Sequence, residues 1–138
     1  TAVKLFYFTV VKSGSSLIME IDRIVYVNEL LDLYGNLLTE KQREVMFYYF
    51  SDNLSFGEIG LELGISRQAV SDTVKKSEQL LYFYEDSLKI YEKQNHILNI
   101  KLNIKKNLAD FKDRYSLTKQ QLDDIDGIIK LCEESKSI

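Results

Sequence analysis

The sequence predicts an all-α protein that contains a helix-turn-helix. Three observations support this fold class. The 138 residues include no proline, apolar residues recur at helical spacings, and helix-start signals occur at four places. Proline interrupts helices, so its absence favours long uninterrupted ones. We expect a helix-turn-helix domain over residues 19–82 and a C-terminal helical extension over residues 83–138.

Residues 1–18 differ in composition from the rest of the chain. Leu5 to Val11 are seven uncharged, mostly apolar residues between two lysines. A membrane-spanning helix needs about 20 such residues, so we expect no membrane insertion. A linker-like stretch follows, and helical patterning begins at Met19. We interpret residues 1–18 as sequence upstream of a native start at Met19, or as an N-terminal arm packed on the domain.

Four helix-start signals divide the chain into helices. Thr39, Ser55 and Thr118 are each followed three residues later by Glu or Gln, the pattern of a capping box that satisfies free amides at a helix start. Ser66 is a fourth cap without the second half of the box. The predicted helices lie near residues 21–38, 40–50 and 56–63, from residue 67 onward, and over 119–134.

The turn between the third and fourth predicted helices carries the helix-turn-helix signal. Gly64 stands just past a helix end, where a left-handed residue is common and glycine adopts it without steric cost. Ser66 caps the next helix at once, so the two helices must cross steeply. Gly60 lies where they should nearly touch. The structural positions of the motif are Ser55, Ile59, Gly60, Leu63, Gly64, Ile65, Val70 and Val74.

The glycines of this segment admit two other interpretations. A phosphate-binding loop fails on spacing, because G-x-x-G-x-x-x-G matches neither G-x-G-x-x-G nor a P-loop. An ordinary helical hairpin with a glycine C-cap stays open as an alternative.

The second helix of such a motif enters the major groove of DNA and reads bases with its first turns. Arg67 could pair with guanine and Gln68 with adenine. The candidate DNA-binding residues are Ser66, Arg67, Gln68, Ser71, Lys75 and Lys76. Asp72 lies on the same face, and residues 55–81 carry three basic against four acidic side chains. This acidic balance favours the alternative that the motif contacts protein.

We expect the fourth helix to continue far beyond the motif, as a long recognition and linker helix with a 3.5-residue apolar repeat. This repeat is typical of a coiled-coil seam and predicts a homodimer. The candidate seam residues are Leu81, Tyr84, Leu88, Tyr91, Asn95, Leu98 and Leu102. The repeat changes phase later, so we expect a break or kink near residues 99–103. The alternative is packing within the chain, against Leu30, Leu31, Tyr34 and Leu37.

The sequence contains no recognisable catalytic constellation, so we expect no enzyme. His96 is the only histidine and Cys132 the only cysteine, and their spacing suggests neither a metal site nor a cofactor. A single cysteine fits a reducing compartment, and we expect a cytoplasmic protein. The formal net charge of −3 gives no general attraction to nucleic acid.

Two resemblances narrow the functional expectation. The segments Leu38–Arg43 and Leu63–Val70, with Leu54-Ser55 and Glu58-Ile59 between them, resemble region 4 of bacterial sigma factors. More narrowly, residues 30–81 resemble the YlxM-like helix-turn-helix family, typically encoded beside signal-recognition-particle genes in Gram-positive bacteria. The resemblance implies a regulator that binds double-stranded DNA. A secretion-pathway protein as partner, or an RNA-contacting accessory role, stays open as an alternative.

Overall fold

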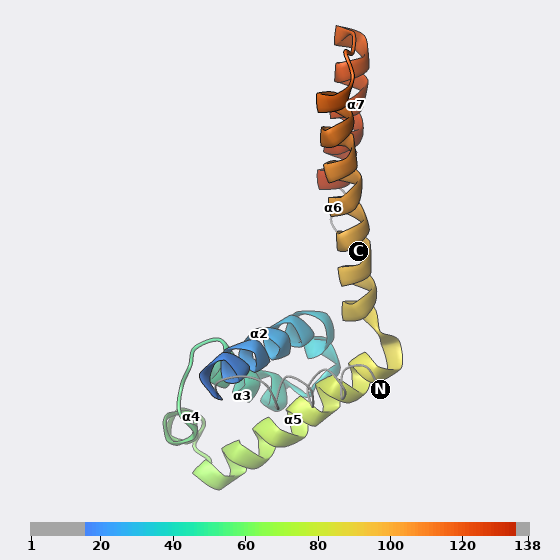
Figure 1. The fold of residues 1–138 in the computed structure, drawn as a ribbon. Coiled ribbons are helices and arrows are strands. Elements are labelled where there is room, and N and C mark those ends of the chain that lie inside the picture. The colour runs from blue at the N-terminus through green and yellow to red at the C-terminus, as the bar shows by residue number, and fades with distance from the viewer. Residues whose placement is uncertain (1–15, 135–138) are drawn as a thin grey trace. The chain divides into compact units, whose positions relative to one another are not determined.

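The computed structural model describes residues 16–134 and shows only helices among them (Figure 1). In chain order these are α2 Ser16–Tyr34, the 3-10 turn η1 Gly35–Leu37, α3 Glu40–Phe50, α4 Phe56–Leu63, α5 Arg67–Leu88, α6 Ile90–Arg114 and α7 Lys119–Glu134. The all-α prediction is confirmed. The interpretation of residues 1–18 falls almost entirely outside the described part.

The chain forms two compact units, one ending at Tyr91 and the other beginning at Glu92. The first contains the helix-turn-helix, and the second is made of α6 and α7. The predicted domain boundary after residue 82 stays a prediction.

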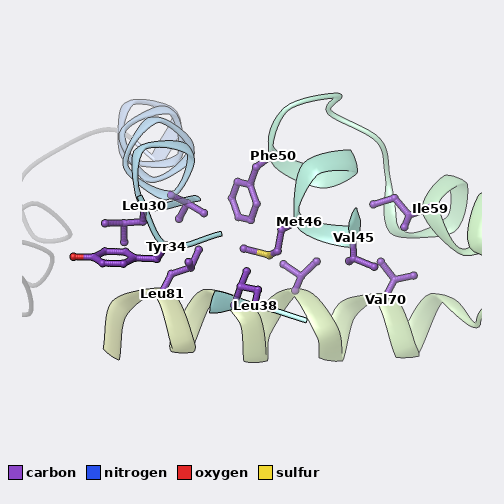
Figure 2. Packing of buried hydrophobic residues seen from close by; sticks show 11 residues of the cluster. Leu30, Tyr34, Leu38, Val45, Met46, Phe50, Ile59, Val70 and Leu81 are labelled. Atoms are coloured by element: carbon purple, nitrogen blue, oxygen red, sulfur yellow. The ribbon is translucent and has the colours of Figure 1, made fainter. Parts of the chain in front are cut away.

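The core of the first unit lies between α2, α3, α4 and α5 (Figure 2). α2 supplies Leu30 and Tyr34, and α3 supplies Met46 and Phe50, all of them buried. The buried cluster consists of Val27, Leu30, Tyr34, Leu38, Val45, Met46, Phe50, Ile59, Val70, Val74 and Leu81. Because α5 contributes from Val70 to Leu81, it is the helix that the other three pack against.

The first predicted helix needs a correction at both ends. α2 begins at Ser16, five residues before the predicted start, and ends at Tyr34. The chain then tightens into the 3-10 turn, and the Leu38 amide donates to the Gly35 carbonyl. The tighter turn brings Leu38 into the core, where it is 5% exposed.

The predicted caps are confirmed. Thr39 and Ser55 each form a full capping box, and the Ser66 hydroxyl accepts from the Ala69 amide at 3.0 Å. Thr118 exchanges the same pair of hydrogen bonds with Gln121. The backbone N–H of Ser55 donates to the Glu58 carboxylate, which lowers the pKa of that carboxyl. Local side-chain chemistry therefore fixes where these helices begin.

The helix-turn-helix closes as the glycines predict. Gly64 has φ +65° and ψ +33°, the left-handed conformation. Gly60 is buried, and a Cβ at this position would lie 2.7 Å from the carbonyl oxygen of Ile65. The Ile65 amide donates to the Gly60 carbonyl at 3.0 Å. The turn thus lies directly on the Gly60 backbone, and no side chain fits between them.

An ion pair joins α2 to α5. The Arg23 guanidinium donates to both carboxylate oxygens of Glu78, at 2.7 and 2.6 Å. The Tyr82 hydroxyl donates to the same carboxylate at 2.5 Å. The guanidinium also lies over the Phe50 ring, 5.5 Å from its centroid. Glu78 is only 7% exposed, and these bonds compensate the cost of burying its charge.

A second buried carboxylate, that of Glu85, lies near the C-terminal end of α5. The Tyr34 hydroxyl donates to Glu85 at 2.5 Å and accepts from the Ile90 amide at 3.2 Å. Glu85 also accepts from the Tyr91 amide at 3.1 Å. Burial, with the bond to Glu85, raises the pKa of the Tyr34 hydroxyl to about 12. The side chains of Tyr34 and Glu85 thus accept hydrogen bonds from the first amides of α6. Lys89, between α5 and α6, adopts the left-handed conformation, with φ +55°.

The prediction of one continuous helix through residue 102 is therefore wrong. The break at Lys89 separates the predicted seam into two parts. Leu81 is fully buried, Tyr84 packs against Tyr34 and Tyr91 against Tyr26. For Leu81, Tyr84 and Tyr91 the alternative, packing within the chain, is confirmed.

The expected break near residues 99–103 is also wrong, because α6 is helical from Ile90 to Arg114 without interruption. The phase change in the sequence reflects two apolar stripes on different sides of one continuous helix.

Alanine substitutions at two glycines of α4 should have opposite effects. Gly60→Ala should lower the free energy of unfolding by about 1–3 kcal/mol, because the new methyl group would overlap the Ile65 carbonyl. Gly57→Ala should raise it by up to about 1 kcal/mol, since alanine is the better helix former and a Cβ there meets nothing closer than 3.9 Å. Urea unfolding followed by circular dichroism measures both, and a Gly60→Ala protein as stable as wild type would contradict the close approach.

Removal of the Glu85 carboxylate should destabilise the first unit. Glu85→Ala leaves the Tyr34 hydroxyl and the Tyr91 amide without this acceptor, which should cost about 1–3 kcal/mol. The neighbouring Asp86 is exposed, so Asp86→Ala is the matched control and should change stability by less than about 0.5 kcal/mol. Equal urea midpoints for the two variants would show that the Glu85 carboxylate does not fix this junction.

Candidate nucleic-acid interface

The candidate interface is built on the start of α5, which the turn after Gly64 and the Ser66 cap hold in place. Val70 and Val74 are buried and fix one side of the helix to the core. The opposite side carries the predicted reading residues. Arg67, Gln68, Asp72, Lys75 and Lys76 are exposed, and Ser71 is partly buried. The predicted residues of α5 therefore lie along its first turns, on the sides of the helix that Val70 and Val74 leave uncovered.

Ser66 has a structural role at this site. Its side-chain oxygen accepts from the Ala69 amide and so fixes the first turn of α5. A serine hydroxyl that accepts a bond still has its own proton to donate. Ser66 can therefore cap the helix and donate to a phosphate oxygen at the same time.

Gln68 and Asp72 form a pair on the exposed face. The Gln68 side-chain nitrogen donates to the Asp72 carboxylate at 3.0 Å. An ionised carboxylate only accepts hydrogen bonds, so the nitrogen end of the Gln68 amide must point toward Asp72. The second N–H and the carbonyl oxygen of the amide stay available, and adenine offers the matching acceptor and donor in the major groove.

The charge of this face differs from the charge of the segment. Glu78 belongs to the core-facing side of α5, where it pairs with Arg23. Glu58 bonds to the Ser55 amide at the start of α4. Between Arg67 and Lys76 the exposed side chains of α5 include three cations and one carboxylate, a formal charge of +2. The acidic balance counted along residues 55–81 included Glu78, which is buried against α2 and does not belong to the exposed surface.

Sequence reasoning missed the inward position of Glu78 and Glu85. The signal was present, because Val74, Glu78, Leu81 and Glu85 follow one another at spacings of four, three and four. This spacing puts all four on one face of a helix. An acidic residue in such an apolar series indicates a buried carboxylate with a partner elsewhere in the fold.

Metal binding and membrane insertion are two other functions that the side chains and helices of residues 16–134 can be checked for. Within residues 16–134, no group of three or more His, Cys, Asp and Glu side chains could hold a metal ion. In the same part of the chain, no helix combines the length and the apolar character needed to cross a membrane. Cys132 is a free, partly buried thiol on α7.

Comparison with known proteins gives a consistent family. Residues 21–125 match the family model UPF0122, described as "Putative helix-turn-helix protein, YlxM / p13 like". A UPF0122 protein of Fusobacterium nucleatum is 40% identical over 107 residues, covering 78% of this chain and 95% of the relative. One from Clostridium acetobutylicum is 37% identical over 114 residues, covering 83% and 92%.

A third relative, from Shouchella clausii, is 48% identical over 73 residues, covering 53% of this chain and 67% of the relative. The family model spans both the helix-turn-helix and most of the α6–α7 unit. The expected resemblance is confirmed, and the chain belongs to the UPF0122 family of YlxM/p13-like helix-turn-helix proteins.

Proposed function

We propose that the protein binds double-stranded DNA through the exposed face of α5 and acts as a regulator. The observation that carries this proposal is the set of exposed side chains from Arg67 to Lys76, with a formal charge of +2, at the start of the second helix of a helix-turn-helix. In this motif the first turns of that helix meet base edges in the major groove. The proposal further requires that the side chains of these first turns can contact bases and phosphates.

Each exposed side chain has a separate task in the proposal. Arg67 is the first residue after the cap and can donate two bonds to the O6 and N7 atoms of guanine. Gln68 can read adenine with the amide groups that Asp72 leaves available. Lys75 and Lys76, about two turns further along, suit phosphate contacts, with Ser66 and Ser71. Arg67 and Gln68 would give sequence preference, and the residues that contact phosphates would give affinity.

A second candidate function is a protein-interaction module on the same scaffold, with a secretion-pathway protein as partner. The Asp72 carboxylate favours it, because a negative charge among the proposed reading residues repels phosphate.

Selection of bound fragments from random duplex DNA, at low and at physiological salt, distinguishes the two candidate functions. Enrichment of a common sequence supports the DNA proposal. Absence of duplex binding even at low salt overturns it in favour of the second candidate. In either case the proposed location is the cytoplasm, since one cysteine suits a reducing compartment.

Arg67 and Lys75 should respond differently to substitution. Arg67→Ala should cost about 1–3 kcal/mol of discrimination at one base pair of the selected site. Lys75→Ala should weaken all duplexes alike and reduce the slope of log affinity against log salt by about one unit. Affinity for the selected site and for single-base variants, measured over a salt series, separates the two effects. Equal losses on every sequence would mean that the face makes only electrostatic contacts.

Asp72→Ala should strengthen binding to unrelated DNA and reduce selectivity. The substitution removes a negative charge from the face and also releases the Gln68 amide. We expect non-specific affinity to rise by a few-fold at low salt, and preference at the base pair read by Gln68 to fall. Asp32→Ala, which removes an exposed carboxylate from α2, is the control for net charge alone. Identical salt curves and selectivities for the two variants would contradict a local role of Asp72.

A further inference from the structure

The α6–α7 unit has too small a core to account for its own stability. α6 and α7 form an antiparallel hairpin (Figure 1), linked by ion pairs of Lys105 with Glu133 and of Lys112 with Asp126, each at 2.7 Å. Among residues 92–134 only Ile125 is buried, at 9% exposed. Helices form stable domains by burying an apolar stripe against a further layer, and a unit of this size usually needs additional stabilisation, such as oligomerisation.

One side of α6 carries an exposed apolar stripe with coiled-coil spacing. Ile97, Ile100, Ile104, Asn107 and Phe111 follow one another at three, four, three and four residues, which places them along one line of the helix. The four apolar members are 39–47% exposed. The side of α6 that is turned away from α7 is polar, with Asn99, Asn103, Lys106 and Asp110. The stripe is therefore a defined surface, which we call the isoleucine face.

α7 extends the isoleucine face. The partly buried Leu122 and Ile129, with Ile125, lie toward α6, and Ile128 is one helical step to the side, 46% exposed. The two ion pairs fix the register of the hairpin and place Ile128 nearly level with Phe111. In an antiparallel hairpin with these contact residues, helix geometry puts Ile128 on the side of the isoleucine stripe. Leu131, 67% exposed, adjoins it one turn further along.

We propose that the isoleucine face binds the same face of a second copy of this chain. The face contains no charged residue at its stripe positions, so two copies can approach without repulsion. Its one polar stripe member, Asn107, has a side-chain amide that both donates and accepts. Two such amides across a two-fold axis satisfy each other, and a single Asn on an apolar seam is a known device for fixing register. Asn107 thus favours a second copy over an unrelated partner.

The available area suits a weak to moderate dimer. Six side chains, each exposing roughly half of about 150–200 Å², offer on the order of 500 Å² per copy. A symmetric pair would then bury about 1,000 Å², which is near the lower limit for a specific interface. The spacing of three and four residues predicts helices crossing at about 20°, as in a four-helix bundle.

The remaining part of the sequence-predicted seam provides a matched control. Leu98 and Leu102 are each 52% exposed, but they lie on the other flank of α6. The next positions in that series are Lys105, which pairs with Glu133, and Ala109. Because the apolar series on this flank ends at Leu102, we assign the interface to the isoleucine face.

Two double variants of the full chain test the interface. Ile100→Asp with Ile104→Asp should weaken dimerisation by roughly tenfold or more, because buried charges would lie at the centre of the interface. Leu98→Asp with Leu102→Asp makes the same chemical change on the other flank and should leave the dimer intact. Sedimentation equilibrium across micromolar concentrations measures both, with circular dichroism to check helicity. Wild type that is monomeric at tens of micromolar, or dissociation by the control alone or by both pairs equally, overturns the proposal.

A crosslink tests the two-fold axis without perturbing the apolar side chains. In a Cys132→Ser background, Asn107→Cys should form a disulfide-linked dimer under mild oxidation, because the two thiols would meet across the axis. Ala109→Cys, on the flank of α6 that carries Leu98 and Leu102, should stay largely monomeric. If both variants crosslink to the same extent, or neither does, position 107 does not lie at an axis and the proposed interface is wrong.

Discussion

The contact between the Gly60 backbone and the carbonyl of Ile65 is the constraint on which the helix-turn-helix depends. A single methyl group at this position would lie 2.7 Å from that oxygen, so the turn can approach α4 only where no Cβ exists. The approach sets the direction in which α5 leaves the turn. α5 is 22 residues long, or about 33 Å, and it carries the reading face at one end and Glu85 at the other.

The two buried carboxylates of α5 define how α2 lies on it. Glu78 pairs with Arg23 and Glu85 with Tyr34, so both contacts connect the same two helices about two turns apart. A shift of α2 by one turn would separate both pairs together. Each carboxylate would then be buried without these partners, at a cost of about 1–3 kcal/mol or more. Apolar packing alone tolerates such shifts far better than a pair of directional contacts.

Local chemistry made the helix starts and the glycine turn predictable from sequence. Capping boxes and the left-handed Gly64 depend on residues within a few positions, so their pattern is visible without the fold. The end of α5 was not predictable in this way, because Lys89 is not a typical left-handed residue and its conformation depends on Tyr34, 55 positions earlier. The charge of the reading face was misjudged for a similar reason, since the partner of Glu78 is the distant Arg23.

An acidic chain is compatible with the proposed DNA contact of α5, because charges act over limited distances. At physiological salt the screening length is about 8 Å, so the charge of the surface proposed to meet DNA matters more than the formal −3 of the whole chain. Asp72 lowers the charge of that surface and at the same time orients Gln68. In the proposed DNA complex, both effects would reduce attachment to arbitrary DNA more than attachment to a matching site. Specificity is a difference between two affinities, and a carboxylate beside the proposed reading amide would increase that difference by weakening the unwanted affinity.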